Sequence, residues 1–189
     1  MMETTKKYEL TNNAIVIDGV TLYQIKALKD FSDVKAGDLG GWIEKEENLS
    51  QMGDAWVYSN AKVFGYAFVR DDAWICNDAV VFGDAQVYGN AQVYGAALVY
   101  GCAKVFGKAQ AYNTAIVCGD AQVFGNAQVY DNTRVYGSAK VYDNAVVCGN
   151  ARVRGNAKVY GSTKVYDNAV VCGDIKIFGN SRVCGDSYI

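Results

Sequence analysis

Residues 85–108 read AQVYGN AQVYGA ALVYGC AKVFGK, which is one six-residue pattern written four times. The pattern runs from residue 55 to residue 189 without insertion or deletion. Val or a substitute occupies 23 positions, each six residues from the next, and 19 of them are Val. The residue two places before each of these positions is Ala in 18 cases, and all but one of the others are Thr or Ser. So regular a repeat indicates a solenoid rather than a globular core.

A period of six fits short strands and does not fit helices. Ala and Val are two residues apart, so their side chains point to the same side of a strand. The residue between them and the aromatic residue that usually follows Val point to the other side. The next position is Gly in 15 of 22 repeats and otherwise Asp, Asn or Ser, residues that tolerate left-handed backbone. Each hexad therefore predicts one strand and one bend.

Three hexads can close one triangular coil, because a single strand and bend cannot bury its Ala and Val side alone. Stacked coils would bury a continuous column of Ala and Val and would pair every strand with the coils above and below. The repeat predicts about 7.5 coils, and a strand spacing of roughly 4.8 Å gives a prism about 36 Å long. We therefore expect an all-β, three-sided parallel β-helix.

The hexads resemble the hexapeptide-repeat family of left-handed parallel β-helices. Ala91 follows Val87 where that family has its small residue, but an aromatic residue, Tyr88, stands where the family often has Gly. The Gly comes one position later, at Gly89. The resemblance implies a single-stranded helix of left-handed sense.

The resemblance extends upstream of the hexads. The sequences DFSDVKAG (30–37), GGW (40–42), LSQ (49–51) and GD (53–54) are similar to the segment that leads into the solenoid of bacterial YdcK-type proteins. Those proteins are often labelled acyltransferases, and relatives of this kind also occur in phages and mobile elements. The likeness thus covers residues 28–189.

Residues 1–50 are expected to cap the open strand edges at one end of the solenoid. Residues 14–17 and 20–23 predict a β-hairpin with a type I′ turn at Asp18-Gly19. Residues 29–50 are polar and charged and predict a looped connection. The chain is therefore divided into a cap, 1–50, and a β-helix, 51–189.

The amino-acid composition excludes several classes of function. The net charge is −2, from 18 basic and 20 acidic side chains, which does not suit a strongly basic nucleic-acid binder. The chain has no histidine, so histidine-based acid–base catalysis and histidine-ligated metals are excluded. Acyltransferases and carbonic anhydrases of the resembled fold depend on histidine. We expect no catalytic residue, no cofactor and no metal.

The six cysteines are predicted to be free thiols. Five of them replace the aromatic residue of a hexad, and no two are separated by three hexads, so none stacks directly on another. Free thiols are typical of a reducing cytoplasm. We expect a cytoplasmic protein, because no signal peptide or membrane-spanning segment is evident.

Outward positions that recur once per coil should form straight rows on the prism. One row and the aromatic row beside it form a candidate surface for a macromolecular partner: Lys104, Lys140, Lys158, Lys176, Phe124, Tyr142 and Tyr160. Lysines beside aromatic rings suit a polyanion, and the rings could act as a stacking platform. The alternatives are a solvated face and rings that only stabilise the coils.

A second row offers an apolar stripe for self-association, which we expect to give a homodimer. The candidate residues combine this stripe with the last coil: Val80, Phe82, Leu98, Tyr100, Ile116, Ile177, Val183 and Ile189. The first choice is pairing of two C-terminal ends, and the second is side-by-side contact through the stripe. A monomer is the alternative.

Three functions follow from these features. The first is a non-catalytic binding or scaffold protein with a protein partner, such as a phage or mobile-element inhibitor of a host protein. The second is an acyltransferase-like enzyme with an unusual base. The third is a nucleic-acid or polyanion binder that uses the lysine row.

Overall fold

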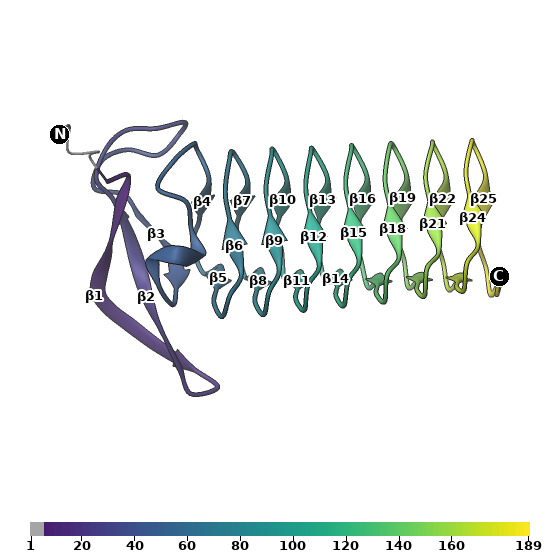
Figure 1. Cartoon of the computed structure of the whole chain (residues 1–189), viewed down its shortest axis with the longest axis horizontal. Coiled ribbons are helices and arrows are strands. Elements are labelled where there is room, and N and C mark those ends of the chain that lie inside the picture. The colour runs from purple at the N-terminus through teal and green to yellow at the C-terminus, as the bar shows by residue number, and fades with distance from the viewer. Residues whose placement is uncertain (1–5) are drawn as a thin grey trace.

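The computed structural model describes residues 6–189, and most of the chain forms a straight stack of coils (Figure 1). Each coil has three short strands joined by bends. A strand pairs in parallel with the strands three hexads before and after it, as Val105 does with Val87 and Val123. The predicted all-β, three-sided parallel solenoid with three hexads per coil is confirmed.

The strands form three sheets, one for each side of the prism, and the first also contains the cap. The ten-stranded sheet contains β1 (Tyr8–Ile17), β2 (Val20–Ala27), β3 (Leu39–Ile43), β5 (Lys62–Val63), β8 (Val80–Val81), β11 (Leu98–Val99), β14 (Ile116–Val117), β17 (Arg134–Val135), β20 (Arg152–Val153) and β23 (Val170–Val171). The eight-stranded sheet contains β4 (Trp56–Val57), β7 (Trp74–Ile75), β10 (Gln92–Val93), β13 (Gln110–Ala111), β16 (Gln128–Val129), β19 (Val146–Val147), β22 (Lys164–Val165) and β25 (Arg182–Val183). The seven-stranded sheet contains β6 (Phe68–Val69), β9 (Gln86–Val87), β12 (Lys104–Val105), β15 (Gln122–Val123), β18 (Lys140–Val141), β21 (Lys158–Val159) and β24 (Lys176–Ile177).

The core is the predicted column of Ala and Val side chains. Val123 and Ala121, in the middle of the solenoid, are fully buried, as are nearly all their equivalents. Thr133 replaces Ala in the column and is also fully buried, and its hydroxyl donates a hydrogen bond to the carbonyl of Tyr130. The buried column tolerates this polar residue because its hydroxyl has a hydrogen-bond acceptor nearby in the chain.

Hydrogen bonds between coils run with one polarity at the strand ends and corners. Most N–H groups there donate to a carbonyl of the following coil: Trp74 N lies 3.1 Å from Ala91 O, and Cys76 N lies 3.0 Å from Val93 O. The side of a coil that faces the N-terminus therefore presents carbonyl acceptors at these positions. The side that faces the C-terminus presents N–H donors.

The bends depend on left-handed backbone, as the sequence predicts. The residue after the aromatic position has a positive φ in every hexad from Ser59 to Gly185, including those where it is Asp or Asn. Asp71, with φ of 61°, also accepts a hydrogen bond on its carboxylate from the N–H of Gly89 in the next coil, at 3.0 Å. This bond helps to offset the strain of a non-glycine residue in that conformation.

The predicted hairpin is present and is longer than expected. β1 and β2 pair from Tyr8↔Ala27 to Ile17↔Val20, beyond the residues 14–17 and 20–23 that the pattern indicated. The turn residues Asp18 and Gly19 have φ of 50° and 82°, which fits the predicted type I′ turn.

The expectation of a loop over residues 29–50 is wrong in its second half. β3 and the short 3₁₀ helix η1 (Glu46–Asn48) lie there, and β3 pairs in parallel with β5 through Ile43↔Val63. Leu49 forms a parallel bridge with Val69. Ile43 and Leu49 are fully buried or nearly so and continue the inward column. The parallel pairing of the coils thus begins in this segment, before the first hexad.

Two adjacent glycines let β3 approach the first coil. A Cβ on Gly40 would lie 2.6 Å from the carbonyl oxygen of Val57, and a Cβ on Gly41 would lie 2.6 Å from that of Ala61. No side chain fits at such distances, which explains the GGW motif in physical terms.

The cap supplies hydrogen-bond donors to the carbonyls that the first coil presents. Lys7 Nζ donates to Ala55 O at 2.8 Å, and Asn48 Nδ2 donates to Ala67 O at 2.9 Å. Both donor side chains are buried. Backbone N–H groups of the cap donate hydrogen bonds to further carbonyls of the first coil: Trp42 to Ala61, Glu44 to Val63 and Ser50 to Val69.

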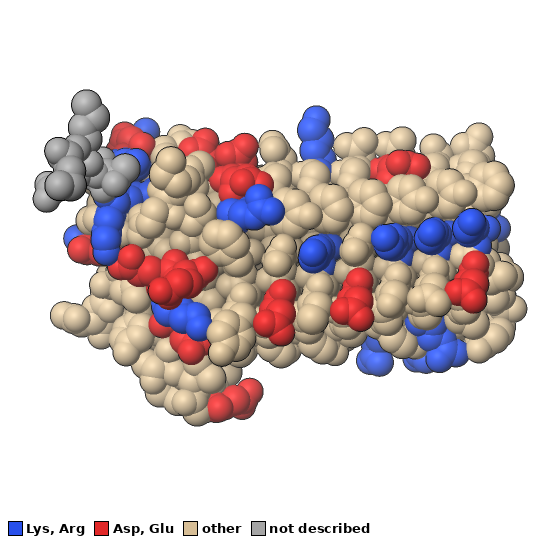
Figure 2. All heavy atoms as spheres, in the orientation of Figure 1, with Lys and Arg blue, Asp and Glu red and all other residues tan. Residues whose placement is uncertain are grey.

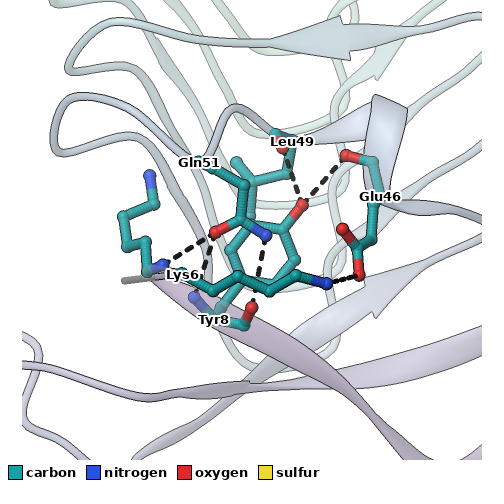
Figure 3. A network of polar contacts seen from close by, with 6 residues as sticks. Lys6, Tyr8, Glu46, Leu49 and Gln51 are labelled. Atoms are coloured by element: carbon teal, nitrogen blue, oxygen red, sulfur yellow. Dashed lines mark hydrogen bonds and ion pairs between the residues drawn. The ribbon is translucent and has the colours of Figure 1, made fainter. Parts of the chain in front are cut away.

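A polar network fixes β1 to the segment before the first coil (Figure 3). The Tyr8 hydroxyl shares its single proton between two carbonyl oxygens, Leu49 O at 2.7 Å and Glu46 O at 3.0 Å. Gln51 Nε2 donates to Tyr8 O at 3.2 Å, and Lys6 forms an exposed ion pair with Glu46. Burial raises the pKa of the Tyr8 phenol above its usual range, so the hydroxyl stays a donor.

The inward assignment predicts effects of very different size for neighbouring substitutions on β15. Val123→Asp would bury an unpaired charge and should lower the free energy of unfolding by at least about 4 kcal/mol. Gln122→Asp, on the outward side of the same strand, should lower it by less than about 1 kcal/mol. Urea denaturation followed by circular dichroism measures both, and equal effects would contradict the core assignment.

The buried Lys7 predicts a pH dependence of stability. Burial lowers the pKa of Lys7 from 10.5 to about 8, so between these values the unfolded chain binds the extra proton. The free energy of unfolding of the wild type, relative to Lys7→Met, should therefore rise from pH 8 to pH 10, by up to about 1.4 kcal/mol per pH unit.

Tryptophan fluorescence during urea denaturation measures this difference, because Trp42, Trp56 and Trp74 all lie in or beside the cap. Other titrating groups contribute equally to both proteins and cancel. Parallel stability curves for the two proteins over this range would contradict the prediction.

Candidate functional site

The four lysines predicted to share a face lie in one row on the seven-stranded sheet. Lys140 pairs in register with Lys158, and Lys158 pairs with Lys176. Gln122 separates Lys140 from Lys104. We call these four residues the lysine strip, and Figure 2 shows basic side chains following one another along this side of the prism.

The ammonium groups of the lysine strip have no acidic partner within residues 6–189. The ion pairs found in that range join Lys6 to Glu46, Lys35 to Asp30 and Arg70 to Asp71. Lysines on adjacent strands are only about 4.8 Å apart at the backbone, so their like charges repel one another mildly. An anionic surface laid along the strip would relieve that repulsion.

Aromatic rings form a wall beside the lysine strip. Successive rings stack face to face: the centroids of Phe124 and Tyr142 are 4.8 Å apart with an interplanar angle of 1°, and those of Tyr142 and Tyr160 are 4.8 Å apart at 3°. The succession is unbroken and comprises Tyr88, Phe106, Phe124, Tyr142, Tyr160 and Phe178.

This stacking removes the ring faces from solvent. Each interior ring has a neighbour on both faces, so Phe124, Tyr142 and Tyr160 present only their edges outward. A nucleobase needs a free ring face on which to stack. The stacking platform suggested by the sequence is therefore not available at these three interior rings, which act as a rigid flank of the lysine strip.

Carboxylates lie at the corner that precedes the seven-stranded sheet. Asp84, Asp120 and Asp174 each stand two residues before a strand of that sheet. Acidic side chains accordingly lie below the basic row in Figure 2. The surface thus alternates between a basic row and a sparser acidic one.

Amide ladders at the corners were not anticipated from the sequence. Asn132, Asn150, Asn168 and Asp186 occupy the second corner position of successive coils, and each Asn donates through Nδ2 to the next side chain at 3.0–3.3 Å. The recurrence of Asn in every third hexad is the signal that could have revealed them. These bonds link the corners of successive coils.

The apolar stripe is present on the ten-stranded sheet. Val80, Leu98 and Ile116 pair in register and are half-buried. Phe82 and Tyr100 stack beside them with centroids 4.9 Å apart. The homodimer contact through this stripe stays a prediction.

The last coil offers less apolar surface than expected. Ile177 and Val183 belong to the inward column and are only 8% and 7% exposed, whereas Ile189 is 43% exposed. Of these three predicted contact residues, only Ile189 presents substantial side-chain area to solvent.

The two tryptophans of the eight-stranded sheet behave differently from the other aromatic residues. Trp56 and Trp74 pair in register, but Trp56 is buried under the cap and packs edge-on against Tyr8 and Phe31. Trp74 is 40% exposed and packs against Tyr58. The cap therefore interrupts the ring stacking at this end.

The remaining side-chain chemistry is sparse. All six cysteines are free in the structure. Within residues 6–189, no three His, Cys, Asp or Glu side chains gather in a way that could hold a metal ion. In the same range, no helix has the length and apolar character needed to cross a membrane.

Comparison with known proteins identifies the type of repeat. A sequence model of the YdcK β-solenoid repeat matches residues 85–101, 121–137 and 127–142. A stretch of 51 residues is 51% identical to the Escherichia coli (strain K12) protein named "Uncharacterized acetyltransferase YdcK". The aligned part is 26% of this chain and only 16% of that protein. These matches agree with the resemblance noted in the hexads.

Proposed function

We propose that this YdcK-like β-solenoid protein is a non-catalytic cytoplasmic binding protein whose lysine strip contacts an acidic face of a partner protein. The observation that carries the proposal is the in-register row formed by Lys140, Lys158 and Lys176, which has no carboxylate partner within residues 6–189. Lysines held in line on a sheet form a straight array of donors, and an acidic row on a partner would complement it.

The rigidity of the coils favours binding. Inter-coil hydrogen bonds hold the backbone at each lysine, as between Lys140 N and Ala157 O at 2.9 Å. The stacked rings beside the strip restrict the neighbouring side chains as well. On this side of the interface only the lysine side chains lose freedom when a partner docks, so no further cost arises from ordering the backbone.

A protein partner fits this surface better than a nucleic acid. The ring faces that would receive bases are covered by neighbouring rings, and the Asp84, Asp120 and Asp174 carboxylates would repel a phosphate backbone. The chain as a whole carries a charge of −2. A protein surface with acidic residues facing the lysines and basic residues facing these carboxylates satisfies both rows.

Acetyl transfer is the second candidate, and the name of the E. coli relative favours it. The chain lacks histidine, so the base would have to be a carboxylate, a thiol or a phenol. A charged lysine ammonium has no lone pair that could accept a proton, so no residue of the lysine strip can act as the base. The non-catalytic proposal is therefore preferred.

The lysine strip predicts salt-dependent binding of an acidic peptide. Fluorescence anisotropy with a labelled Asp/Glu-rich peptide at low ionic strength should show binding to the wild type. Lys140→Glu/Lys158→Glu should weaken it at least about tenfold, because two attractive charges become repulsive. Lys164→Glu/Arg182→Glu, which makes the same charge change on the eight-stranded sheet, is the matched control and should change it less than about threefold.

An oligonucleotide of equal charge distinguishes the partner classes in the same assay. Tighter binding of the oligonucleotide than of the peptide would move the function to nucleic acid. Absence of binding to either probe, or an equal loss in the control variant, would overturn the proposed use of the strip.

The non-catalytic assignment predicts no acetyl transfer. Incubation of the protein with acetyl-CoA and a panel of amines, including spermidine and free lysine, should release CoA no faster than a blank without protein. Chromatographic measurement of CoA avoids interference from the protein's six cysteines. Protein-dependent release that requires an amine would show an enzyme instead.

A further inference from the structure

A second row of stacked rings is interrupted on the ten-stranded side of the solenoid. Phe64, Phe82 and Tyr100 stack in succession, with centroids 5.2 and 4.9 Å apart. The next coil has Cys118 at the equivalent position, and the coil after it has Tyr136. The row therefore lacks one ring between Tyr100 and Tyr136.

The missing ring leaves a cavity of about 280 Å³. It is lined by Tyr100, Ile116, Cys118, Arg134, Tyr136 and Arg152. We call it the ring gap.

The dimensions of the ring gap suit one planar ring. Tyr100 and Tyr136 are two coils apart, so their separation is about twice the 4.8 Å at which successive rings of the intact row stack. A ring inserted midway would lie at stacking distance from both tyrosines. Unlike the interior rings of the intact row, each of these two tyrosines has a ring face that no other ring covers in the described part of the chain.

The ring gap also carries positive charge. Arg134 and Arg152 pair in register on the ten-stranded sheet and both are exposed. Neither forms an ion pair within residues 6–189, and no carboxylate lines the cavity. Guanidinium groups recognise phosphate and carboxylate through paired N–H donors.

A comparable gap on the eight-stranded side shows that this charge is particular to the site. Cys148 lies between Tyr130 and Tyr166, and the cavity there is lined by Lys164 and Arg182. It is also lined by Asp131 and Asp167, which offset the two basic residues. The gap at Cys148 therefore lacks the unopposed positive charge of the ring gap.

We propose that the ring gap binds a small planar aromatic anion, with its ring between Tyr100 and Tyr136 and its anionic group on Arg134 and Arg152. A nucleoside monophosphate has this chemistry. The site lies on a different sheet from the lysine strip, and the proposal does not depend on the function suggested above.

Isothermal titration calorimetry with three probes tests the assignment. AMP supplies both a ring and an anion, adenosine supplies the ring alone, and ribose 5-phosphate supplies the anion alone. AMP should bind the wild type saturably, and each of the other two should bind at least about tenfold more weakly. No saturable binding of AMP would overturn the proposal, as would equal affinity for AMP and either partial probe.

Filling the ring gap provides the sharpest variant. Cys118→Tyr restores the residue type found at equivalent positions, so the row should become continuous and AMP affinity should fall at least about tenfold. Cys148→Tyr is the matched control, because it fills the other gap and should leave AMP affinity unchanged. Equal affinity of Cys118→Tyr and wild type would overturn the proposal.

A second variant does not depend on accommodating a new ring. Arg134→Gln/Arg152→Gln changes two exposed side chains and should weaken AMP at least about tenfold while leaving the weak affinity for adenosine unchanged. Lys140→Glu/Lys158→Glu should bind AMP as the wild type does, which separates this site from the lysine strip. An unchanged AMP affinity in the arginine variant would overturn the anion contact.

Discussion

The hydrogen bond between a backbone N–H and a carbonyl of the following coil is the constraint on which the structure depends. It is repeated along the solenoid, as from Asp78 to Gly95, and it requires three full hexads in every coil. Any side chain that recurs at that interval is therefore placed directly above its predecessor. Rows of lysines, rings and amides are consequences of this one register, and so is the buried column of Ala and Val.

The solenoid could be predicted from the sequence because each hexad repeats the same order of buried, outward and bend residues. Val123 and Asp71 illustrate it: one is buried and the other takes left-handed backbone, as their positions in the hexad indicate. The cap could not be predicted equally well. Leu49 and Val57 are eight residues apart instead of six, which hides the first coil from a periodicity argument. The donor role of Lys7 becomes visible only when its carbonyl acceptors are in place.

The sequence predicts which side chains of the candidate surfaces lie in a row, but it does not predict which groups those side chains leave accessible to a ligand. Position in the hexad placed Lys140 and Tyr142 beside each other, but the orientation of the rings is a tertiary property. Because the rings stack through their faces, a cysteine in the row leaves the rings on either side of it without a stacking neighbour. Cys118, which the sequence predicts to be a free thiol, marks the place where two ring faces are left open.

At strand ends and corners, the shared direction of most inter-coil hydrogen bonds gives the prism a head and a tail. At strand ends and corners, equivalent edges of two copies carry the same groups, so a two-fold axis through those edges would place N–H opposite N–H. Growth in one direction, by contrast, matches donor to acceptor, and the cap occupies the acceptor end. A two-fold contact through the side of the prism where Val80, Leu98 and Ile116 lie would meet no such mismatch.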